Sequence, residues 1–165
     1  MPENKSFDPS RLCQIAVVVK SIDETVKFYQ ELFAIGPFEI REANFPNATY
    51  YGKKAGYRGK RAFAQLGPVT LELIELIEGK TVHEDFLKEK GEGLHHIGCY
   101  VDILDEAVAI MEKQGISVLQ SGNRPGGGYA YMDTEKTLGA IFELIRRPTS
   151  MLTPVAVWPE TEESI

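Results

Sequence analysis

The chain has 165 residues, of which 43% are apolar and 25% charged, and its net charge is −6. This composition is typical of a single globular domain, and the acidic balance argues against a nucleic-acid partner. No apolar stretch is long enough to span a membrane, and the start MPENKSFDPS lacks the apolar core of a signal peptide, so a cytoplasmic location is the default expectation.

The first half of the chain is predicted to form one helix and four strands after a flexible N-terminus at 1–10. Apolar runs indicate the strands, and Ser21 offers an N-cap to a helix that Gly36-Pro37 ends. The expected elements are a strand at 12–19, a helix at 22–34, strands at 38–45, 61–66 and 69–77, and a turn at 57–59.

The second half is predicted to repeat this order after a helical linker at 81–93. Helical spacing of apolar residues indicates a helix at 103–114, and Gly115 ends it. The expected strands lie at 94–101, 116–119, 129–132 and 140–145, with a loop at 124–128 and a C-terminal tail at 148–165.

The two halves also share sequence. Residues 14–26 reappear at 96–108, an offset of 82 residues, and residues 71–74 resemble 142–145. Two small modules of this kind would not each bury enough surface alone. We therefore expect one α+β domain at 11–147, in which two tandem βαβββ modules (11–80 and 94–147) are related by pseudo-twofold symmetry. Their curled mixed sheets would enclose a metal-binding cleft.

Each half places one polar residue early and one late inside apolar strands, where a polar side chain needs a partner. The early pair is Gln14 and His96, and the late pair is Glu72 and Glu143. Two carboxylates balance one divalent ion, and an imidazole and an amide oxygen complete a ligand set for Zn, Ni, Co, Mn or Fe. A lone Glu could instead face water from an edge strand, and a lone His could be a core residue. The repeat correlates all four and favours the metal.

A basic segment lies on this acidic chain between Tyr50 and Phe63. It could bind a polyanionic small molecule, such as a coenzyme A or glutathione conjugate, or it could be a solvated loop. The candidate substrate-binding residues are Lys53, Lys54, Arg58, Lys60 and Arg61.

The stretch from Gln14 to Phe33 resembles the vicinal oxygen chelate superfamily, which includes glyoxalase I, methylmalonyl-CoA epimerase, extradiol dioxygenases and bleomycin-resistance proteins. The resemblance covers roughly residues 12–147. The stretch 86–97 and the glycines at 126–128 are similar to methylmalonyl-CoA epimerase in particular. The resemblance implies a homodimer and a metal-dependent lyase or isomerase that moves a proton next to a carbonyl or thioester.

The resemblance implies that Glu143 would be both a metal ligand and the catalytic base, and that Glu72 would serve the opposite face of the substrate. The sequence departs from the epimerase at three places: Gln14 replaces a usual His, Glu72 replaces a usual Gln, and Arg61 or Ala62 stands where a catalytic carboxylate is expected. The ligand set is closer to that of glyoxalase I (lactoylglutathione lyase), which acts on a thiol hemithioacetal. A metal-free, ligand-sequestering protein of the bleomycin-resistance type is the remaining alternative.

Overall fold

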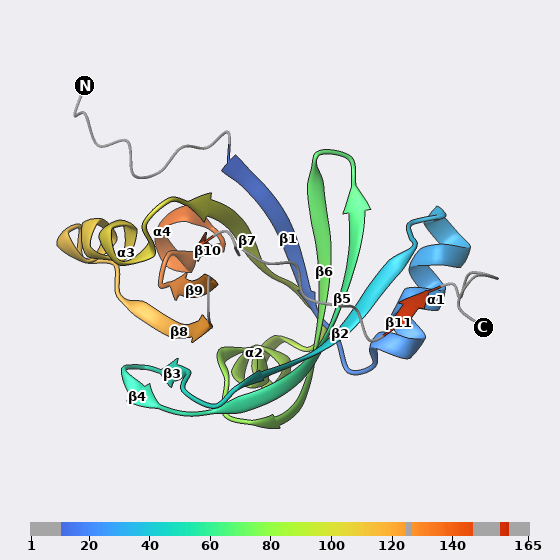
Figure 1. Ribbon diagram of the computed structural model, residues 1–165, viewed down its shortest axis with the longest axis horizontal. Helices are drawn as coiled ribbons and strands as arrows, with labels where there is room; N and C mark the ends of the chain where they lie inside the picture. The colour runs from blue at the N-terminus through green and yellow to red at the C-terminus, as the bar shows by residue number, and fades with distance from the viewer. Residues whose placement is uncertain (1–10, 125–126, 147–155, 159–165) are drawn as a thin grey trace.

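The computed structural model describes residues 11–124, 127–146 and 156–158. Its strands form one mixed sheet in the order β11-β2-β5-β6-β1-β7-β10-β9-β8-β3-β4. The sheet curls into a half-barrel, with α1 outside one end and α3 outside the other (Figure 1). The fold is therefore α+β, as the sequence predicts.

The bounds of the elements are as follows: β1 Leu12–Val18, α1 Ile22–Phe33, β2 Phe38–Phe45, β3 Thr49–Tyr50, β4 Lys53–Lys54, β5 Tyr57–Leu66, β6 Val69–Gly79, α2 Val82–Lys90, β7 Gly93–Val101, α3 Leu104–Lys113, β8 Val118–Arg124, β9 Gly127–Met132, α4 Glu135–Leu138, β10 Ile141–Arg146 and β11 Ala156–Trp158.

The strand order is symmetric about the junction of β1 and β7. On either side the order is first strand, last strand and then the middle strands, which gives β1-β6-β5-β2 in one half and β7-β10-β9-β8 in the other. Ile15 and Ile97, which are equivalent in the sequence repeat, are also directly paired partners between antiparallel β1 and β7. The pseudo-twofold axis therefore passes between these two residues.

Helices α1 and α3 cover the convex side of the sheet, whereas α2 packs on the concave side, where Phe86 and Leu87 contact Ala16 and Ile74. Val26 of α1 packs with Phe38 and Leu73 in a buried apolar cluster, and Leu104 of α3 packs with Met132 and Leu144 in its counterpart. Because side chains alternate along a strand, the neighbours of these core residues point into the concave side. The polar residues of the repeat lie on that side.

Two predicted boundaries were wrong. Tyr57–Gly59 is not a turn but the start of β5, which has a bulge between Arg58 and Gly59. The strand predicted at 116–119 runs instead from Val118 to Arg124. The predicted loop at 124–128 is correspondingly shorter, because β9 begins at Gly127, and residues 125–126 lie outside the described residues.

The predicted flexible segment 1–10 also lies outside the described residues, as does most of the predicted tail. Within that tail, β11 pairs antiparallel with β2, so it adds an edge strand to the first half of the sheet. Across the described ranges, no helix combines the length and the apolarity needed to cross a bilayer.

Candidate metal centre and cleft

The pseudo-twofold axis brings the two late glutamates to the centre of the sheet. Glu72 of β6 is the strand partner of Ala16, and Glu143 of β10 is the strand partner of Gly98. Ala16 and Gly98 occupy equivalent places in the repeat. The two carboxylates are therefore held symmetrically beside the β1–β7 junction, where the small neighbours leave room for them.

The four polar residues of the repeat are in mutual contact. Gln14 Nε2 donates to Glu72 Oε2 at 2.7 Å and to Glu143 Oε2 at 3.1 Å. His96 Nε2 lies 3.0 Å from Glu143 Oε2, 3.7 Å from Glu72 Oε2 and 3.3 Å from Gln14 Nε2. Residues that are up to 129 positions apart thus converge on one point.

This donor set fits a divalent cation. Bonds of about 2.0–2.2 Å place neighbouring ligand atoms roughly 3.0–3.5 Å apart, which is close to the separations observed between His96 and the two glutamates. Glu72 and Glu143 are only 7% and 5% exposed, and buried carboxylates need balancing positive charge. The Gln14 amide, turned by half a rotation about its terminal bond, presents an oxygen to the same point.

Gly98 is required beside this cluster. A Cβ at that position would lie 2.9 Å from both Gln14 Cβ and Ile145 Cδ1, and 3.4 Å from Glu143 Oε2. We expect Gly98→Ala to lower the free energy of unfolding by about 1–3 kcal/mol through overpacking, and to weaken metal binding by displacing Gln14. Urea unfolding and metal titration measure the two effects.

Gly93 on the same strand provides the matched control. A Cβ there would meet only Phe86 Cζ, at 3.9 Å, so Gly93→Ala should be tolerated. Equal stability and metal affinity in both variants would show that the ligands do not need the space that Gly98 leaves.

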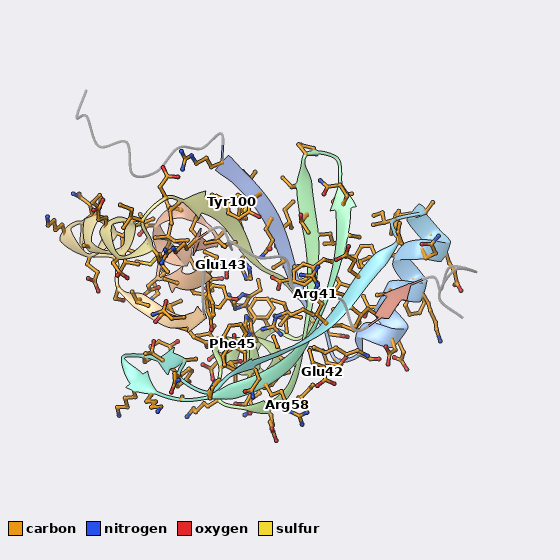
Figure 2. The ribbon with its side chains drawn as sticks, viewed as in Figure 1. Arg41, Glu42, Phe45, Arg58, Tyr100 and Glu143 are labelled. Carbon is orange, nitrogen blue, oxygen red and sulfur yellow. The ribbon has the colours of Figure 1, made fainter. Side chains whose placement is uncertain are left out.

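A cleft of about 640 Å³ opens over this cluster on the concave side of the sheet. Both modules line it: Gln14, Arg41, Arg61 and Glu72 come from the first, and Tyr100, Tyr129, Tyr131 and Glu143 from the second. In Figure 2, Arg41 and Phe45 on β2 lie on one side of this hollow, and Tyr100 and Glu143 lie on the other. His96 itself is fully buried and lies behind the cleft surface.

The predicted basic segment does not face the cleft as a unit. Arg61 lines the cleft, where its Nε lies 3.3 Å from Glu72 Oε1. Lys60 pairs with Asp23 of α1 on the convex side. Arg58, which is labelled in Figure 2, lies near the start of β5 and pairs with Glu78. Lys53 and Lys54 are exposed on the short strand β4. A role for these four residues in substrate binding stays a prediction.

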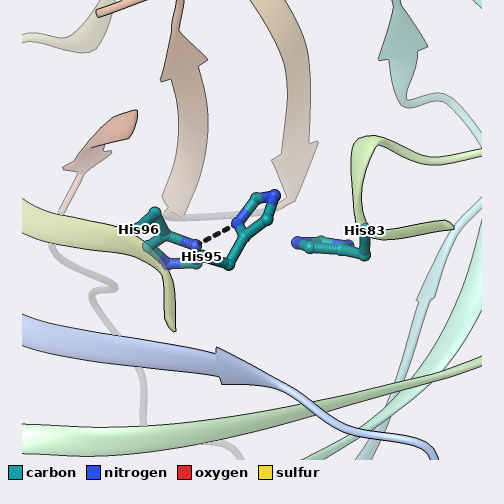
Figure 3. Close-up of side chains that lie close together, drawn as sticks. All are labelled: His83, His95 and His96. Atoms are coloured by element: carbon teal, nitrogen blue, oxygen red, sulfur yellow. Dashed lines mark hydrogen bonds between the residues drawn. The ribbon is translucent and has the colours of Figure 1, made fainter. Parts of the chain in front are cut away.

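A buried histidine cluster lies beside the candidate metal ligands (Figure 3). His96 Nδ1 is 2.9 Å from His95 Nδ1, and His83 Nε2 is 3.1 Å from the Tyr131 hydroxyl. When His96 offers Nε2 to a cation, its Nδ1 carries the proton and donates a hydrogen bond to His95 Nδ1, which fixes the orientation of the His96 ring. His83, His95 and His96 form a second group of possible metal ligands, but this group contains no carboxylate.

Burial and the nearby positive charges hold the pKa of His83 well below its ordinary value of 6.5. The unfolded chain therefore takes up a proton on this residue as the pH falls through about 6.5, whereas the folded chain does not. Stability is lost below that pH, by about 1.4 kcal/mol per pH unit for one histidine. We expect His83→Leu to reduce this slope by that amount in urea unfolding of chelator-treated protein between pH 7 and 5.5. Identical slopes in the variant and the parent would contradict this assignment.

Two residues of the site region, Arg41 and His83, were not predicted from the sequence. Arg41 lines the cleft from β2. Glu39 and Arg41 are two residues apart and therefore share one face of the strand, and this pair of opposite charges was the sequence signal that could have identified Arg41. His83 was placed in a helical linker, and nothing in its local pattern indicates that the start of α2 is buried beneath the sheet.

Comparison with known proteins gives one family. Residues 13–132 match the model of the glyoxalase/bleomycin resistance protein/dioxygenase superfamily. YqjC, an uncharacterized protein of Bacillus subtilis (strain 168), is 29% identical over 138 residues, which are 82% of this chain and 91% of YqjC.

Among solved structures, the fold is similar to methylmalonyl-CoA epimerases. A variant of the Streptomyces coelicolor enzyme in complex with 2-nitronate-propionyl-CoA has a TM-score of 0.63 at 21% identity, over 82% of this chain and 96% of that one. The Mycobacterium tuberculosis enzyme has a TM-score of 0.61 at 16% identity, over 83% and 87%. An epimerase in complex with methylmalonyl-CoA has a TM-score of 0.64 at 20% identity, over 84% and 95%. The family match spans most of the chain and agrees with the fold, so this protein belongs to the glyoxalase/bleomycin resistance protein/dioxygenase superfamily.

Proposed function

We propose that the protein is a metal-dependent isomerase of the methylmalonyl-CoA epimerase type, which moves a proton at a carbon next to a thioester carbonyl. The observation that carries the proposal is the convergence of Gln14, Glu72, His96 and Glu143 at one end of the cleft. Similar folds in complexes with coenzyme A esters support the choice of a thioester. The cation would be one divalent ion, such as Zn, Ni, Co or Mn.

A bound divalent cation would polarise the substrate carbonyl and so acidify the adjacent C–H bond. Glu143 is the base in this proposal because its carboxylate lines the cleft and meets the other ligands through Oε2 alone in the described contacts. It would take the proton from one face of the substrate carbon. The surrounding Tyr100, Tyr129 and Tyr131 would exclude water from the reacting centre.

Glu72 is less free to act as a base. Arg61 Nε lies 3.3 Å from Glu72 Oε1, and Glu72 Oε2 is the oxygen that lies near His96 Nε2 and would meet the cation, so both oxygens of this carboxylate would be occupied in the loaded site. We assign Glu72 chiefly to holding the cation, with its role at the second face of the substrate as a lesser part of the proposal.

The constrained Glu72 supports a second candidate, a lactoylglutathione lyase acting on a thiol hemithioacetal. A proton shift between adjacent carbons needs one base, whereas epimerisation with exchange at both faces needs a donor on each side. The Gln, Glu, His and Glu set is also the one that the sequence resemblance associates with glyoxalase I.

Deuterium exchange separates these functions. Metal-reconstituted protein is incubated in D₂O with a methylmalonyl thioester and, separately, with the hemithioacetal of methylglyoxal, and the products are analysed by mass spectrometry. Metal-dependent label next to the thioester carbonyl supports the epimerase type, and conversion of the hemithioacetal supports the lyase. Tight ligand binding without either reaction would replace both with a sequestering protein of the bleomycin-resistance type.

Assembly as a homodimer and a cytoplasmic location belong to the same proposal. They follow from the resemblance and the composition of the chain alone, and sedimentation analysis of the purified protein tests the first of them.

A further inference from the structure

Two tyrosines, one from each module, join their hydroxyl groups inside the half-barrel. The hydroxyl of Tyr57 on β5 lies 2.8 Å from the hydroxyl of Tyr129 on β9, and both side chains line the cleft. Both residues are buried, so each hydroxyl proton needs an acceptor. One hydrogen bond between the two oxygens uses only one of the two protons, and its direction decides which proton is left for the cleft.

Gln120 of β8 sets the direction of the hydrogen bond between Tyr129 and Tyr57. The Val82 backbone N–H can only donate, so the Gln120 atom 2.8 Å from it is the amide oxygen, and Gln120 Nε2 is the atom that donates to the Tyr129 hydroxyl at 3.0 Å. If Tyr129 donates onward to Tyr57, each bond polarises the next and strengthens it. The reverse direction would place two donors on the Tyr129 oxygen and leave the buried Tyr129 proton without an acceptor among the described residues. The donors therefore run from Gln120 through Tyr129 to Tyr57.

Tyr57 is the last donor of this series, and its own O–H proton has no acceptor among the described residues. Its ring lies under Arg61, whose guanidinium carbon is 5.9 Å from the ring centroid and whose Nε reaches Glu72 at 3.3 Å. Burial raises the pKa of Tyr57 above its ordinary value of 10, whereas the Arg61 charge and the hydrogen bond from Tyr129 act to lower it, and nearby Glu143 and Glu72 act to raise it. At neutral pH the Tyr57 hydroxyl therefore keeps its proton, beside the carboxylates of the candidate metal centre.

The proposed isomerase needs a proton donor of this kind. Epimerisation removes a proton from one face of a carbon and returns a proton to the other face. Glu143 acts on one face in the proposed mechanism, and both oxygens of Glu72 would be occupied in the loaded site. Glu143 comes from β10 of the second module and Tyr57 from β5 of the first, so the two side chains reach the cleft from different modules.

We propose that Tyr57 is a second catalytic residue, which gives its hydroxyl proton to the face of the substrate carbon opposite Glu143; this role rests on the proposed function. Glu143 takes the proton from the carbon, and the electron pair of the C–H bond passes to the carbonyl oxygen as an enolate. The pair returns to the carbon when it bonds to the Tyr57 proton, which leaves Tyr57 as a phenolate. Arg61 and the Tyr129 O–H stabilise this phenolate. After product release, Glu143 loses its proton to water and Tyr57 regains one from water, which restores both groups.

The test supplies each enantiomer of a methylmalonyl thioester separately to the metal-loaded full chain in D₂O. Mass spectrometry measures the deuterium label, and chiral chromatography measures the configuration. The parent chain should label and invert both enantiomers. Tyr57→Phe should slow inversion by about 10²-fold or more, the usual cost of removing a general acid, and should confine labelling to the enantiomer whose proton faces Glu143. That labelling leaves the configuration unchanged, because Glu143 returns deuterium to the face from which it took the proton.

Two further tyrosine variants separate the donor from its surroundings. Tyr129→Phe removes the hydroxyl that donates to Tyr57 but leaves the Tyr57 proton in place, so inversion should fall by only about tenfold. Tyr51→Phe is the matched control and should behave like the parent, because Tyr51 is 55% exposed between β3 and β4 and lies outside the cleft lining. Urea unfolding and metal content establish that each variant is folded and loaded.

Inversion of both enantiomers at the parental rate by folded, metal-loaded Tyr57→Phe would overturn the role of Tyr57 and leave the proposed function intact. An equal loss of labelling from both enantiomers would also overturn it, because Tyr57 would then shape the site without donating to one face. A parent chain that inverts neither enantiomer would reject the proposed isomerase, and the role of Tyr57 with it.

Discussion

Replacing Glu143 with glutamine is expected to slow deuterium exchange into the substrate by about 10²- to 10⁴-fold, the usual cost of removing a general base. The amide keeps the size of the carboxylate and an oxygen near the metal position, but it cannot accept the proton. Because a neutral oxygen replaces a charged one, metal affinity should fall as well. Exchange rates are therefore compared at saturating metal.

Glu78→Gln is the control for this substitution. Glu78 is an exposed carboxylate that pairs with Arg58 at the far end of β6, so its neutralisation should leave exchange unchanged. If Glu143→Gln retains both its metal and the full exchange rate, Glu143 is neither ligand nor base, and the proposed mechanism is wrong.

Replacing Arg61 with methionine should destabilise the metal-free protein by about 3–5 kcal/mol, because it leaves Glu72 buried without its cation. A bound divalent ion supplies positive charge to the same carboxylate, so the loss should be smaller in the metal-loaded protein. Urea unfolding with a chelator and with saturating Zn measures the difference between the two states.

Arg58→Met is the comparison on the same strand. Arg58 is 41% exposed and pairs with Glu42 and Glu78 near solvent, and pairs of this kind contribute about 1 kcal/mol or less. An Arg61→Met variant with equal losses in the two metal states would mean that Glu72 and the cation do not share one site.

The architecture could be predicted because the repeat specifies it. The strands around Ile15 and Ile97 are continuous apolar runs at a fixed offset, and the register of β1 with β7 places the pseudo-twofold axis between these two residues. The alternation of Glu72 with Leu71 and Leu73 likewise predicts which face of β6 turns toward the cleft. Both predictions depend only on patterns within single strands and on the repeat, and for that reason they could be made from the sequence.

The missed elements depend on contacts that no local pattern contains. Residues 120–123 are polar and were expected to follow a strand, but Gln120 is buried because its Oε1 accepts from Val82 N at 2.8 Å and its Nε2 donates to the Tyr129 hydroxyl at 3.0 Å. Those partners come from α2 and β9, so no pattern within residues 118–124 predicts that the strand continues through Gln120.

Gly59 misled the prediction of β5 in a similar way. A glycine in a polar stretch is typical of a turn, yet here a Cβ would lie 2.5 Å from Arg61 Nη1 and 3.0 Å from the Glu75 carbonyl oxygen. The glycine therefore lies within the strand and leaves space for the buried guanidinium. The sequence showed Arg61 as one of five basic residues, and only this tertiary contact singles it out.

The most direct test of the account is the metal content of the purified chain after chelation and reconstitution with Zn or Co, measured by elemental analysis. His96 belongs both to the cluster with Glu72 and Glu143 and to the cluster with His83 and His95, so the decisive variants are Glu72→Ala and His83→Leu. We predict one ion per chain, lost in Glu72→Ala and retained in His83→Leu. A parent protein that binds no metal, or one whose metal survives Glu72→Ala but not His83→Leu, would contradict the central claim.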